Sequence, residues 1–563
     1  MVTGFEFSRL CARGGLHIFD YAEYPSIIRG GHNTYQISVD EKEIFSQLSE
    51  VNLLVALDKQ TVDKNLKEVP PGGGLIYDSE AAGMGDVIIG RGDVKICPVP
   101  LSKLAREAGG KDLMRNSVAL GATIALLNYD FEIYSRIMSE VFSKKGEKVI
   151  NENISTGRAG YDYIRNNFQN DFSYRLDKVP GPPRMVITGN EAMAMGAIKA
   201  GCKFYSAYPM TPVSGILHFM AAREREFNLV VKHTEDEISA INMAIGASFA
   251  GVRSMVATSG GGFSLMVEAL GMAAITETPL VIVEGQRPGP STGMPTWTEQ
   301  GDLRFVMHSS QGDFLRVVIA PGDIKESFYS TMDAFNLAEK YQLPVIIITD
   351  KYLSEGHKTA EIFDTSAVKI DRGEYVYGDA AKDLSRYEIT GSGISPRVVP
   401  LPGGKIYCAN SDEHDKTGLV TEEADLRVKM MDKRAGKESL LLKDIPGPVL
   451  YGPEKADITL VGWGSTKNTV LEAMKYIEKD GISANFLHLV FIHPLRTEKL
   501  VQVLNSARRK VIIENNQSGQ LAGFIREKTG IEMDNRILKY DGRPFFPEEI
   551  CKRVKEVLAI AGA

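Results

Sequence analysis

Two runs of the sequence, Leu280-Val281-Ile282-Val283 and Val345-Ile346-Ile347-Ile348, are apolar at every position. A strand with one solvated face alternates apolar and polar residues, whereas a strand buried on both faces is apolar throughout. Segments of helical periodicity lie before and after these strands. The pattern predicts a doubly wound parallel sheet with helices on both faces, in an α/β protein.

The same alternation runs from Met185 to Thr349 and predicts the other elements of this sheet. We expect further strands at Cys202 to Ala207, Leu229 to Lys232, Ser254 to Ala257 and Leu315 to Ile319. We expect helices at Asn190 to Ala200, Ser214 to Glu226, Asp236 to Phe249, Ser264 to Ala274 and Asp323 to Tyr341.

The length of 563 residues predicts several domains. Residues 1–178 alternate short strands and helices, with one strand expected at Asp86 to Ile89, and end near the stiff linker Val179-Pro180-Gly181-Pro182-Pro183. The predicted sheet occupies residues 179–355. Residues 356–455 are rich in charge, with only short strand-like pieces, and are expected to connect the domains; residues 456–563 form a further α/β domain.

The composition excludes several classes of protein. No apolar run approaches the roughly 18 residues that a membrane helix needs, and nothing marks the chain for export, so we expect a cytoplasmic protein. The net charge is -7 and the basic residues are scattered, which argues against nucleic acid as a partner. The five cysteines are widely separated, which excludes a local metal or iron-sulfur framework.

The stretch Tyr208-Pro209-Met210-Thr211-Pro212 follows a predicted strand and precedes a predicted helix. It holds the Thr211 hydroxyl at the carboxyl end of a parallel strand, where open α/β sheets bind ligands. The two prolines stiffen the backbone on both sides of the threonine. The turn is either a simple helix start or a place where a hydroxyl faces a ligand.

Two further segments allow a structural and a functional interpretation. Thr234-x-x-Glu237 fits a capping box, but Glu237 could instead act as a general acid/base beside a heteroaromatic ring. Arg287, directly after a buried strand, is either an exposed loop residue or a fork for a carboxylate. The glycines of Ser259-Gly260-Gly261-Gly262 allow either a close approach of backbone to a ligand or a tight turn.

In order along the chain, these motifs resemble the pyrimidine-binding domain of the thiamine-diphosphate-dependent 2-oxoacid:ferredoxin oxidoreductases. The resemblance is to their alpha subunit with the gamma domain fused at its amino end, and it covers nearly the whole chain. The segments that carry it are Gly189-Asn190-Glu191-Ala192, Tyr208 to Pro212, Glu237 with Ala240 and Gly246-Ala247, Ser259 to Gly262, Gln286-Arg287 to Thr296, Glu23-Tyr24-Pro25-Ser26 with Arg29-Gly30-Gly31-His32 (gamma domain), Glu413-His414-Asp415 with Lys433-Arg434 (connecting segment), and Gly462-Trp463-Gly464-Ser465, Glu514-Asn515-Asn516 and Gly519-Gln520-Leu521 (transketolase carboxy-terminal-like domain).

The resemblance implies an oxidative decarboxylation of a 2-oxoacid that yields acyl-coenzyme A and carbon dioxide and reduces ferredoxin. Glu237 and Pro209 match the residues that contact the thiamine cofactor, with Glu237 assisting its activation. Thr211 matches the catalytic turn threonine that faces the substrate, and Arg287 and Thr296 match positions that bind the carboxylate and keto group. The fused gamma-alpha layout favours 2-oxoglutarate, or a broad range of 2-oxoacids, over pyruvate alone, with branched-chain and aryl 2-oxoacids as further alternatives.

A partner chain is also implied. The usual diphosphate and magnesium signature of thiamine enzymes is not found in this sequence, and neither are clustered cysteines. Both Mg²⁺ and the iron-sulfur cluster are therefore expected in a beta subunit, with an (alpha-beta)2 assembly and an active site shared between chains. The gamma domain of the family normally begins with a strand and a GxGGQG-like turn, whereas this sequence opens at Met1-Val2-Thr3-Gly4; either the sequence starts late or this member lacks that strand.

Two other functions compete with this interpretation. A non-catalytic assembly subunit would share the fold but would not need Thr211, Glu237 and Arg287 together. A self-contained transketolase or decarboxylase would need its own diphosphate site.

Overall fold

The structure is a computed structural model that describes residues 2–27, 30–84, 90–168, 171–366, 368–400 and 405–560. The strand predicted at Asp86 to Ile89 lies outside the described residues, as does Arg29 of the gamma-domain motif. The chain folds into two compact units: the first contains Met1–Val186, His357–Ile362 and Phe546–Glu548, and the second contains Ile187–Gly356, Phe363–Phe545 and Glu549–Ala563.

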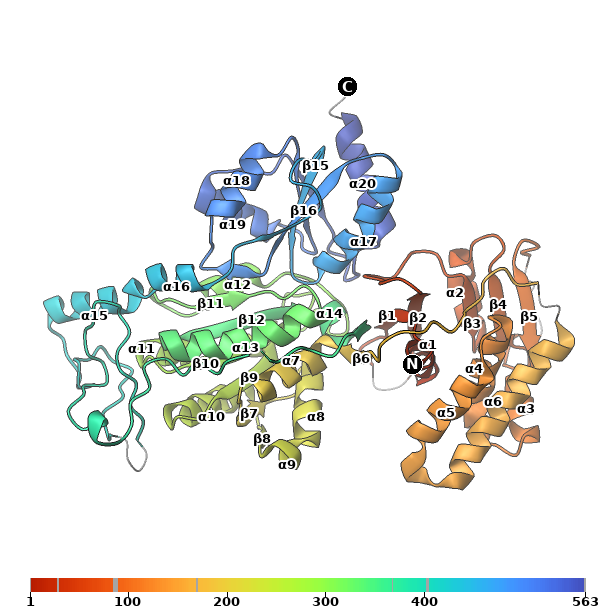
Figure 1. Cartoon of the computed structure of the whole chain (residues 1–563), viewed down its shortest axis with the longest axis horizontal. Coiled ribbons are helices and arrows are strands. Elements are labelled where there is room, and N and C mark those ends of the chain that lie inside the picture. The colour runs from red at the N-terminus through yellow and green to blue at the C-terminus, as the bar shows by residue number, and fades with distance from the viewer. Residues whose placement is uncertain are drawn as a thin grey trace. The chain divides into compact units, whose positions relative to one another are not determined.

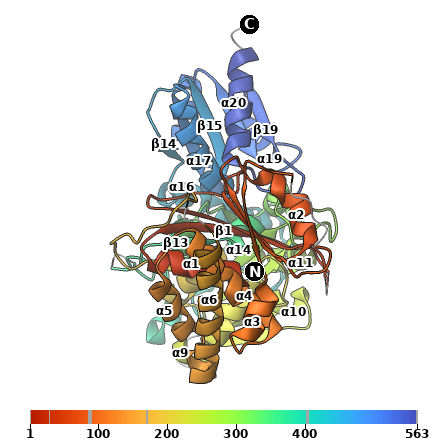
Figure 2. The ribbon, with the colours of Figure 1, turned by 90° about the vertical axis from the view of Figure 1, so that its right-hand side faces the viewer.

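The first unit contains a parallel sheet in the order β3-β4-β5 (Leu53–Ala56, Gly74–Asp78, Lys95–Val99). Four of its helices are α3, α4, α5 and α6 (Leu101–Glu107, Arg115–Leu126, Phe131–Val141, Glu147–Asn167), and Figure 2 shows α4, α5 and α6 side by side. A Cβ at Gly121 would lie 1.9 Å from the Gly157 carbonyl oxygen, and one at Gly160 would lie 2.1 Å from that of Val118. These glycines let the backbones of α4 and α6 touch.

An antiparallel sheet completes this unit. Strand β1 (His17–Glu23) pairs along its length with β2 (Thr34–Asp40), and Phe19 is opposite Lys358 of β13 (His357–Ala360). Helix α1 (Val2–Arg13) packs beside them, and the buried Asp20 carboxylate accepts hydrogen bonds from the hydroxyls of Ser8 (2.8 Å) and Tyr35 (2.7 Å). The start of the predicted connecting segment is thus a strand of the first unit.

The second unit is built on a seven-stranded sheet with the order β17-β11-β12-β10-β9-β7-β8. The strands are β7 (Phe204–Ala207), β8 (Val230–His233), β9 (Ser254–Ser259), β10 (Leu280–Gln286), β11 (Val317–Ile319), β12 (Pro344–Asp350) and β17 (Phe491–His493). Every pairing is parallel except that of β17 with β11. All seven residues of β10 and of β12 are buried, which confirms the doubly wound parallel sheet.

Helices cover both faces of this sheet (Figure 1). They are α7 (Gly189–Lys199), α8 (Ser214–Ala222), α9 (Glu224–Phe227), α10 (Glu237–Phe249), α11 (Gly260–Ile275), α12 (Leu303–His308), α13 (Ile324–Tyr341) and α14 (Lys351–Glu355). Side chains of α10 and α11, such as Ile241 and Phe263, join Val256 and Ile282 of the sheet in one core. A Cβ at Gly196 of α7 would lie 2.4 Å from the Phe328 carbonyl oxygen of α13, so this glycine allows the close packing of α7 on α13.

The carboxy-terminal part of the second unit has a five-stranded sheet in the order β14-β16-β15-β18-β19. Its elements are β14 (Val449–Tyr451), β15 (Ile458–Trp463), β16 (Ala484–Leu489), β18 (Lys510–Glu514), β19 (Asn535–Leu538), α17 (Thr466–Lys479), α18 (Glu498–Ser506), α19 (Gln520–Thr529) and α20 (Pro547–Ile560). Trp463, Leu487 and Phe524 belong to the same core as Ile282 and Ile346 of the larger sheet. The two sheets therefore share a single core.

Two helices correct the expectation for residues 356–455. Where the sequence predicted only short strand-like pieces, the structure has α15 (Ala424–Gly436) and α16 (Glu438–Asp444). The buried residues of α15 are Met430, Lys433 and Arg434, so its inner face is largely charged and gives no apolar stripe of helical period. Other elements that the sequence did not predict include α5, α6, α20, β2, β5, β14 and β19.

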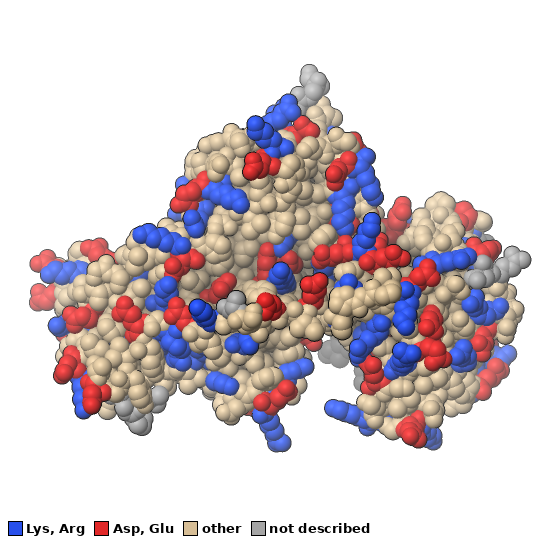
Figure 3. All heavy atoms as spheres, in the orientation of Figure 1, with Lys and Arg blue, Asp and Glu red and all other residues tan. Residues whose placement is uncertain are grey.

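No helix among the described residues is both long and apolar enough to cross a membrane. On the face shown in Figure 3, basic and acidic side chains are interspersed over the surface.

Candidate active site

The turn that contains Thr211 lies between β7 and α8 and is held from two sides. The Asn190 side-chain amide donates a hydrogen bond of 2.8 Å to the Pro212 carbonyl oxygen. On the other side, a Cβ at Gly285 would lie 2.5 Å from Val213 Cγ1, so the end of β10 packs directly against the turn. The Thr211-Pro212 peptide is cis, and Thr211 and Pro209 are both half-buried.

Glu237 is the first residue of α10, and the predicted capping box is wrong. The cap is Asp236, whose carboxylate accepts a hydrogen bond of 2.7 Å from the Ser239 amide. The Thr234 hydroxyl donates instead to the Asp236 carbonyl oxygen at 2.9 Å. Because aspartate is as good a cap as threonine and stands next to the helix, it takes this role. Glu237 is therefore not part of a capping box.

The Glu237 side chain packs against the start of α11. Its exposed fraction is 6%, and a Cβ at Gly262 would lie 2.5 Å from Glu237 Oε1 and 2.1 Å from Thr258 Oγ1. Gly262 therefore leaves room for the glutamate carboxylate. Ser259 is the cap residue of α11, and its buried hydroxyl has no hydrogen-bond partner among the described residues. The Ser259 to Gly262 segment is both a helix start and a place of close approach.

Arg287 follows β10 and reaches the Thr211 turn. Its Nη1 donates a hydrogen bond of 3.2 Å to the Thr211 carbonyl oxygen. Its Nε is buried and has no partner within the described part of the chain. Burial lowers the pKa of Arg287 from its usual value. The structure thus brings Arg287 and the Thr211 turn together, and the resemblance implies that both residues bind the substrate.

Thr296 lies nine residues further along the same loop and is buried, with 6% of its surface exposed. The residues after it enter the interior of the second unit. The Thr298 hydroxyl donates to Asp350 Oδ1 at 3.1 Å, and the Gln300 amide donates to the Trp463 carbonyl oxygen at 2.9 Å. The loop from Arg287 to Gln300 therefore runs from the larger sheet to the carboxy-terminal one.

Four carboxyl groups near this loop were not singled out from the sequence. Burial raises the pKa of Glu284, Asp302 and Asp350, and raises that of Glu299 to about 7. The Glu284 side chain is fully buried at the end of an otherwise apolar stretch. The sequence did contain one signal for this site, namely a charged residue in a strand that has no exposed face. Groups with a shifted pKa are common at functional sites.

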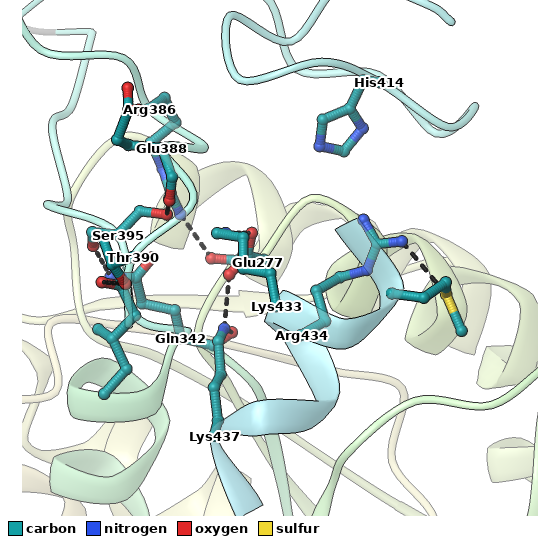
Figure 4. Close-up of polar contacts among 12 residues, drawn as sticks. Glu277, Gln342, Arg386, Glu388, Thr390, Ser395, His414, Lys433, Arg434 and Lys437 are labelled. Atoms are coloured by element: carbon teal, nitrogen blue, oxygen red, sulfur yellow. Dashed lines mark hydrogen bonds and ion pairs between the residues drawn. The ribbon is translucent and has the colours of Figure 1, made fainter. Parts of the chain in front are cut away.

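A second buried cluster, around Glu277, has a different character (Figure 4). The Glu277 carboxylate accepts hydrogen bonds from Lys433 and Lys437 of the connecting segment, the latter at 2.5 Å. Arg386 donates to the Glu277 carbonyl oxygen at 2.7 Å. Arg434 makes a bidentate pair with Glu413, at 3.0 and 2.7 Å. These contacts hold the connecting segment against the sheet. The charged residues Glu413, Lys433 and Arg434 of its motifs therefore have a structural role.

In the part of the chain that the structure describes, no group of three or more His, Cys, Asp or Glu side chains is arranged to hold a metal ion. None of the five cysteines, all of which lie among the described residues, forms a disulfide bond.

Three sequence families match consecutive parts of the chain. Residues 195–433 match the pyruvate flavodoxin/ferredoxin oxidoreductase, thiamine diphosphate-binding family, so the second unit contains a thiamine-diphosphate-binding domain. Residues 1–163 match the pyruvate ferredoxin/flavodoxin oxidoreductase family. Residues 447–530 match the transketolase carboxy-terminal domain.

Characterised relatives match over nearly their whole length. The alpha subunit of 2-oxoacid:ferredoxin oxidoreductase 2 from Aeropyrum pernix is 33% identical over 97% of this chain and 93% of its own. The 2-oxoglutarate oxidoreductase subunit KorA from Mycobacterium tuberculosis is 28% identical over 99% of this chain and 89% of its own.

A solved structure is also similar to this chain in fold and sequence. It is a 2-oxoglutarate:ferredoxin oxidoreductase from Magnetococcus marinus with 2-oxoglutarate, coenzyme A and succinyl-CoA bound, at 32% identity and a TM-score of 0.92 over 99% of this chain and 97% of that one. The order of the family matches, the relatives that match over nearly the whole chain and the shared fold lead to one conclusion. The chain is an alpha subunit of the 2-oxoacid:ferredoxin oxidoreductase family.

Proposed function

We propose that this chain, with a beta subunit, catalyses the thiamine-diphosphate- and coenzyme A-dependent oxidative decarboxylation of 2-oxoglutarate to an acyl-coenzyme A and carbon dioxide, with electrons passing to ferredoxin. Thr211, Arg287 and Thr296 bind the 2-oxoacid, and Glu237 and Pro209 contact the cofactor. Mg²⁺ and the iron-sulfur cluster belong to the beta subunit. The cytoplasmic location and the (alpha-beta)2 assembly stay predictions.

The contact between Arg287 and Thr211 carries this proposal. The hydrogen bond from Nη1 to the turn holds one edge of the guanidinium, while the buried Nε has no partner among the described residues. A planar guanidinium held in this way offers parallel N–H donors to a carboxylate. Thr211, whose carbonyl oxygen accepts the hydrogen bond from Arg287, is half-buried, and in this proposal its hydroxyl faces the substrate.

The surroundings of Glu237 fit the aminopyrimidine ring of thiamine diphosphate. The carboxyl group is almost buried, is not used as a helix cap, and lies over Gly262, which has no Cβ. Such a carboxyl group can exchange a proton with a ring nitrogen. When bound, the cofactor supplies the electron sink for loss of carbon dioxide. The task of this chain is to orient the ring and to hold the substrate beside it.

The choice of 2-oxoglutarate is supported by the relatives. A protein named for 2-oxoglutarate matches over 99% of the chain, and the Magnetococcus marinus structure contains 2-oxoglutarate. The Aeropyrum pernix relative is named only for 2-oxoacids, so a broader range, or pyruvate, branched-chain or aryl 2-oxoacids, are the alternatives.

The surface of α10 and α11 suits a covering beta subunit. Ile238 and Met243 of α10 and Leu265 of α11 are exposed to 50%, 47% and 51%. A Cβ at Gly246 or Gly261 would meet nothing within 4 Å, so no contact inside the described chain explains these helical glycines. Both helices begin at the Glu237 site, so a chain that covers this apolar face would also close the cofactor site.

Co-expression with the beta subunit tests the function. The purified complex should reduce methyl viologen with 2-oxoglutarate only when thiamine diphosphate and coenzyme A are present, and should be slower with pyruvate, branched-chain and aryl 2-oxoacids. Turnover without the cofactor, or a fully loaded complex that oxidises none of these acids, would contradict the proposal. The second result would favour a non-catalytic assembly subunit.

A further inference from the structure

Glu284 is a carboxylic acid in the middle of a parallel sheet. It lies on β10, between Thr258 of β9 and Ile348 of β12, and its exposed fraction is 0%. No N–H or O–H group of a described residue donates a hydrogen bond to either of its oxygens. A buried carboxylate without a donor is strongly destabilised, so the acid must carry its proton or share one.

The neighbour of Glu284 is a second carboxyl group. The side chains of Glu284 and Asp302 come close enough for each to change the pKa of the other through a hydrogen bond. Ionised carboxylates can only accept hydrogen bonds, so this contact requires a proton between them. Burial, with Asp302 adding to it, raises the pKa of Glu284 well above its usual value, which agrees with this requirement.

Asp302 is the better place for the negative charge. Its backbone amide donates a hydrogen bond of 3.0 Å to Gln286 Oε1. Its carboxylate lies against the first turn of α11, because a Cβ at Gly260 would be 2.4 Å from Asp302 Oδ2. The amino end of a 16-residue helix stabilises an anion. The charge therefore lies mainly on Asp302 and the proton mainly on Glu284.

Arg287 is the cation that faces this pair. Glu284 and Asp302 both act on its charge, and the guanidinium is held at Thr211. Two further acids interact with the pair: Asp350 raises the pKa of Glu284, and Asp302 raises the pKa of Glu299. A pair with one proton carries one negative charge, which matches the single positive charge of Arg287.

We propose that Glu284 and Asp302 share one proton behind Arg287, and that the single charge left on the pair positions the guanidinium to receive the carboxylate of the 2-oxoacid. The two acids are positioning residues, and this role rests on the function proposed above. If the pair loses its proton to water, it gains a second negative charge. That charge draws Arg287 back and repels the substrate carboxylate, so binding of the 2-oxoacid should weaken at alkaline pH.

The shared proton can be tested on the isolated full chain, without turnover. The infrared spectrum at neutral pH should contain the C=O band of a buried carboxylic acid that is lost in both Glu284→Gln and Asp302→Asn. In Asp302→Asn the charge moves to Glu284, which accepts a bond from the new amide. Asp364→Asn is the matched control, because Asp364 is exposed and accepts a hydrogen bond of 2.9 Å from the Ser366 amide. The spectrum of each variant is subtracted from that of the wild type, which removes the bands of protonated acids outside the pair, such as Glu299. A difference spectrum without the carboxylic acid band in either pair variant overturns the shared proton.

The positioning role is tested in the complex with the beta subunit. In the wild type, the KM for the 2-oxoacid should rise on the order of tenfold at alkaline pH, since one extra charge in a partly buried site changes affinity by at least this factor. Glu284→Gln cannot gain that charge but still donates to Asp302, so its KM should stay flat with pH and lie within roughly threefold of the wild type at neutral pH. Glu284→Leu should raise the KM at every pH, and the KM for coenzyme A should be unchanged in all variants.

An alkaline rise that persists in Glu284→Gln overturns the positioning role. A complex that oxidises no 2-oxoacid overturns the proposed function and the positioning role with it, and the infrared result then decides the shared proton separately.

Discussion

Strand β10 has a buried glutamate near each end, and the two are opposite in chemistry. Glu277, just before the strand, and Glu284, near its carboxyl end, both have an exposed fraction of 0%. Burial would raise the pKa of Glu277, but Lys437, Lys433 and Arg386 lower it far below its usual value. Burial raises the pKa of Glu284, which receives no N–H or O–H donor from the described residues. Equal burial thus gives an ionised structural anchor at one end and a protonated acid at the candidate active site.

The same substitution should separate the two glutamates most strongly. Glu277→Gln leaves Lys433 and Lys437 buried beside a neutral group, which should lower the free energy of unfolding by about 3–5 kcal/mol. Glu284→Gln exchanges one neutral group for another of similar shape and should change it by about 1 kcal/mol or less. Urea unfolding of the isolated chain, followed by circular dichroism, measures both. Equal losses in the two variants would remove the distinction.

A double variant sharpens this result. Glu277→Gln with Lys433→Met removes a buried charge as well as its partner, so it should be more stable than Glu277→Gln alone. If it is less stable, packing rather than charge holds the cluster together.

Glu237→Gln should have the largest effect on catalysis. An amide cannot exchange a proton with the cofactor ring, so kcat in the complex should fall by roughly a hundredfold or more. Because Asp236 caps the helix, circular dichroism of the variant should be unchanged. The matched control is Asp236→Asn, which keeps a capping side chain and should keep most of the activity. Near-normal turnover of Glu237→Gln would exclude the acid/base role.

Arg287→Lys keeps the charge beside the carboxyl pair but loses the planar fork. The loss of one charge-assisted hydrogen bond should cost about 1.5–3 kcal/mol, or roughly ten- to a hundredfold in kcat/KM for the 2-oxoacid. The KM for coenzyme A should change little and serves as the internal control. Unchanged kinetics for the 2-oxoacid would make Arg287 an ordinary loop residue and would remove the reason for the carboxyl pair behind it.

The sequence predicted the large sheet because its central strands are buried on both faces and are therefore apolar throughout. The carboxyl pair was not predictable in the same way. Glu284 follows such an apolar run, and a charged residue at this place normally marks the end of a strand. Its neighbour Asp302 comes from a loop 18 residues later.

Contacts between residues that are far apart in the sequence explain other differences between the predicted and the observed structure. Lys433 is 156 residues from Glu277, and the charged inner face of helix α15 is stabilised by Glu277 and Glu413, which both lie outside the helix. At the start of α10, Thr234 and Asp236 are both good caps, and the sequence alone did not decide between them. Thr211 and Arg287 come together as predicted, whereas their roles, those of Pro209, Glu237 and Thr296, and the domain limits at residues 178, 355 and 455 stay predictions.

The smallest expected effect concerns pH and a half-buried glutamate, Glu326. Burial alone would raise its pKa, but His488 and Lys467 together lower it to about 2, from a usual value of 4.5. A folded-state pKa below the unfolded one stabilises the fold above pH 4.5, and this contribution is lost as the pH falls from 4.5 towards 2. Glu299, with a pKa raised to about 7 by burial and Asp302, has the opposite sign: its contribution is present below pH 4.5 and is lost as the pH rises towards 7.

Urea unfolding between pH 7 and pH 3 should therefore show two changes of opposite direction. In Glu326→Gln, the loss of unfolding free energy below pH 4.5 should be smaller by on the order of 1–2 kcal/mol. In Glu299→Gln, the change in unfolding free energy between pH 4.5 and 7 should be smaller, and the change below pH 4.5 should be unaffected. Asp333, whose pKa burial raises to about 6, contributes to the same pH range, so the second change should become smaller in Glu299→Gln and smaller again when Asp333→Asn is added. Because Asp302 raises the pKa of Glu299, an unchanged slope between pH 4.5 and 7 in Glu299→Gln would mean that other groups, such as the pair itself, ionise there, and the contrast between Glu277 and Glu284 would then hold only in acid.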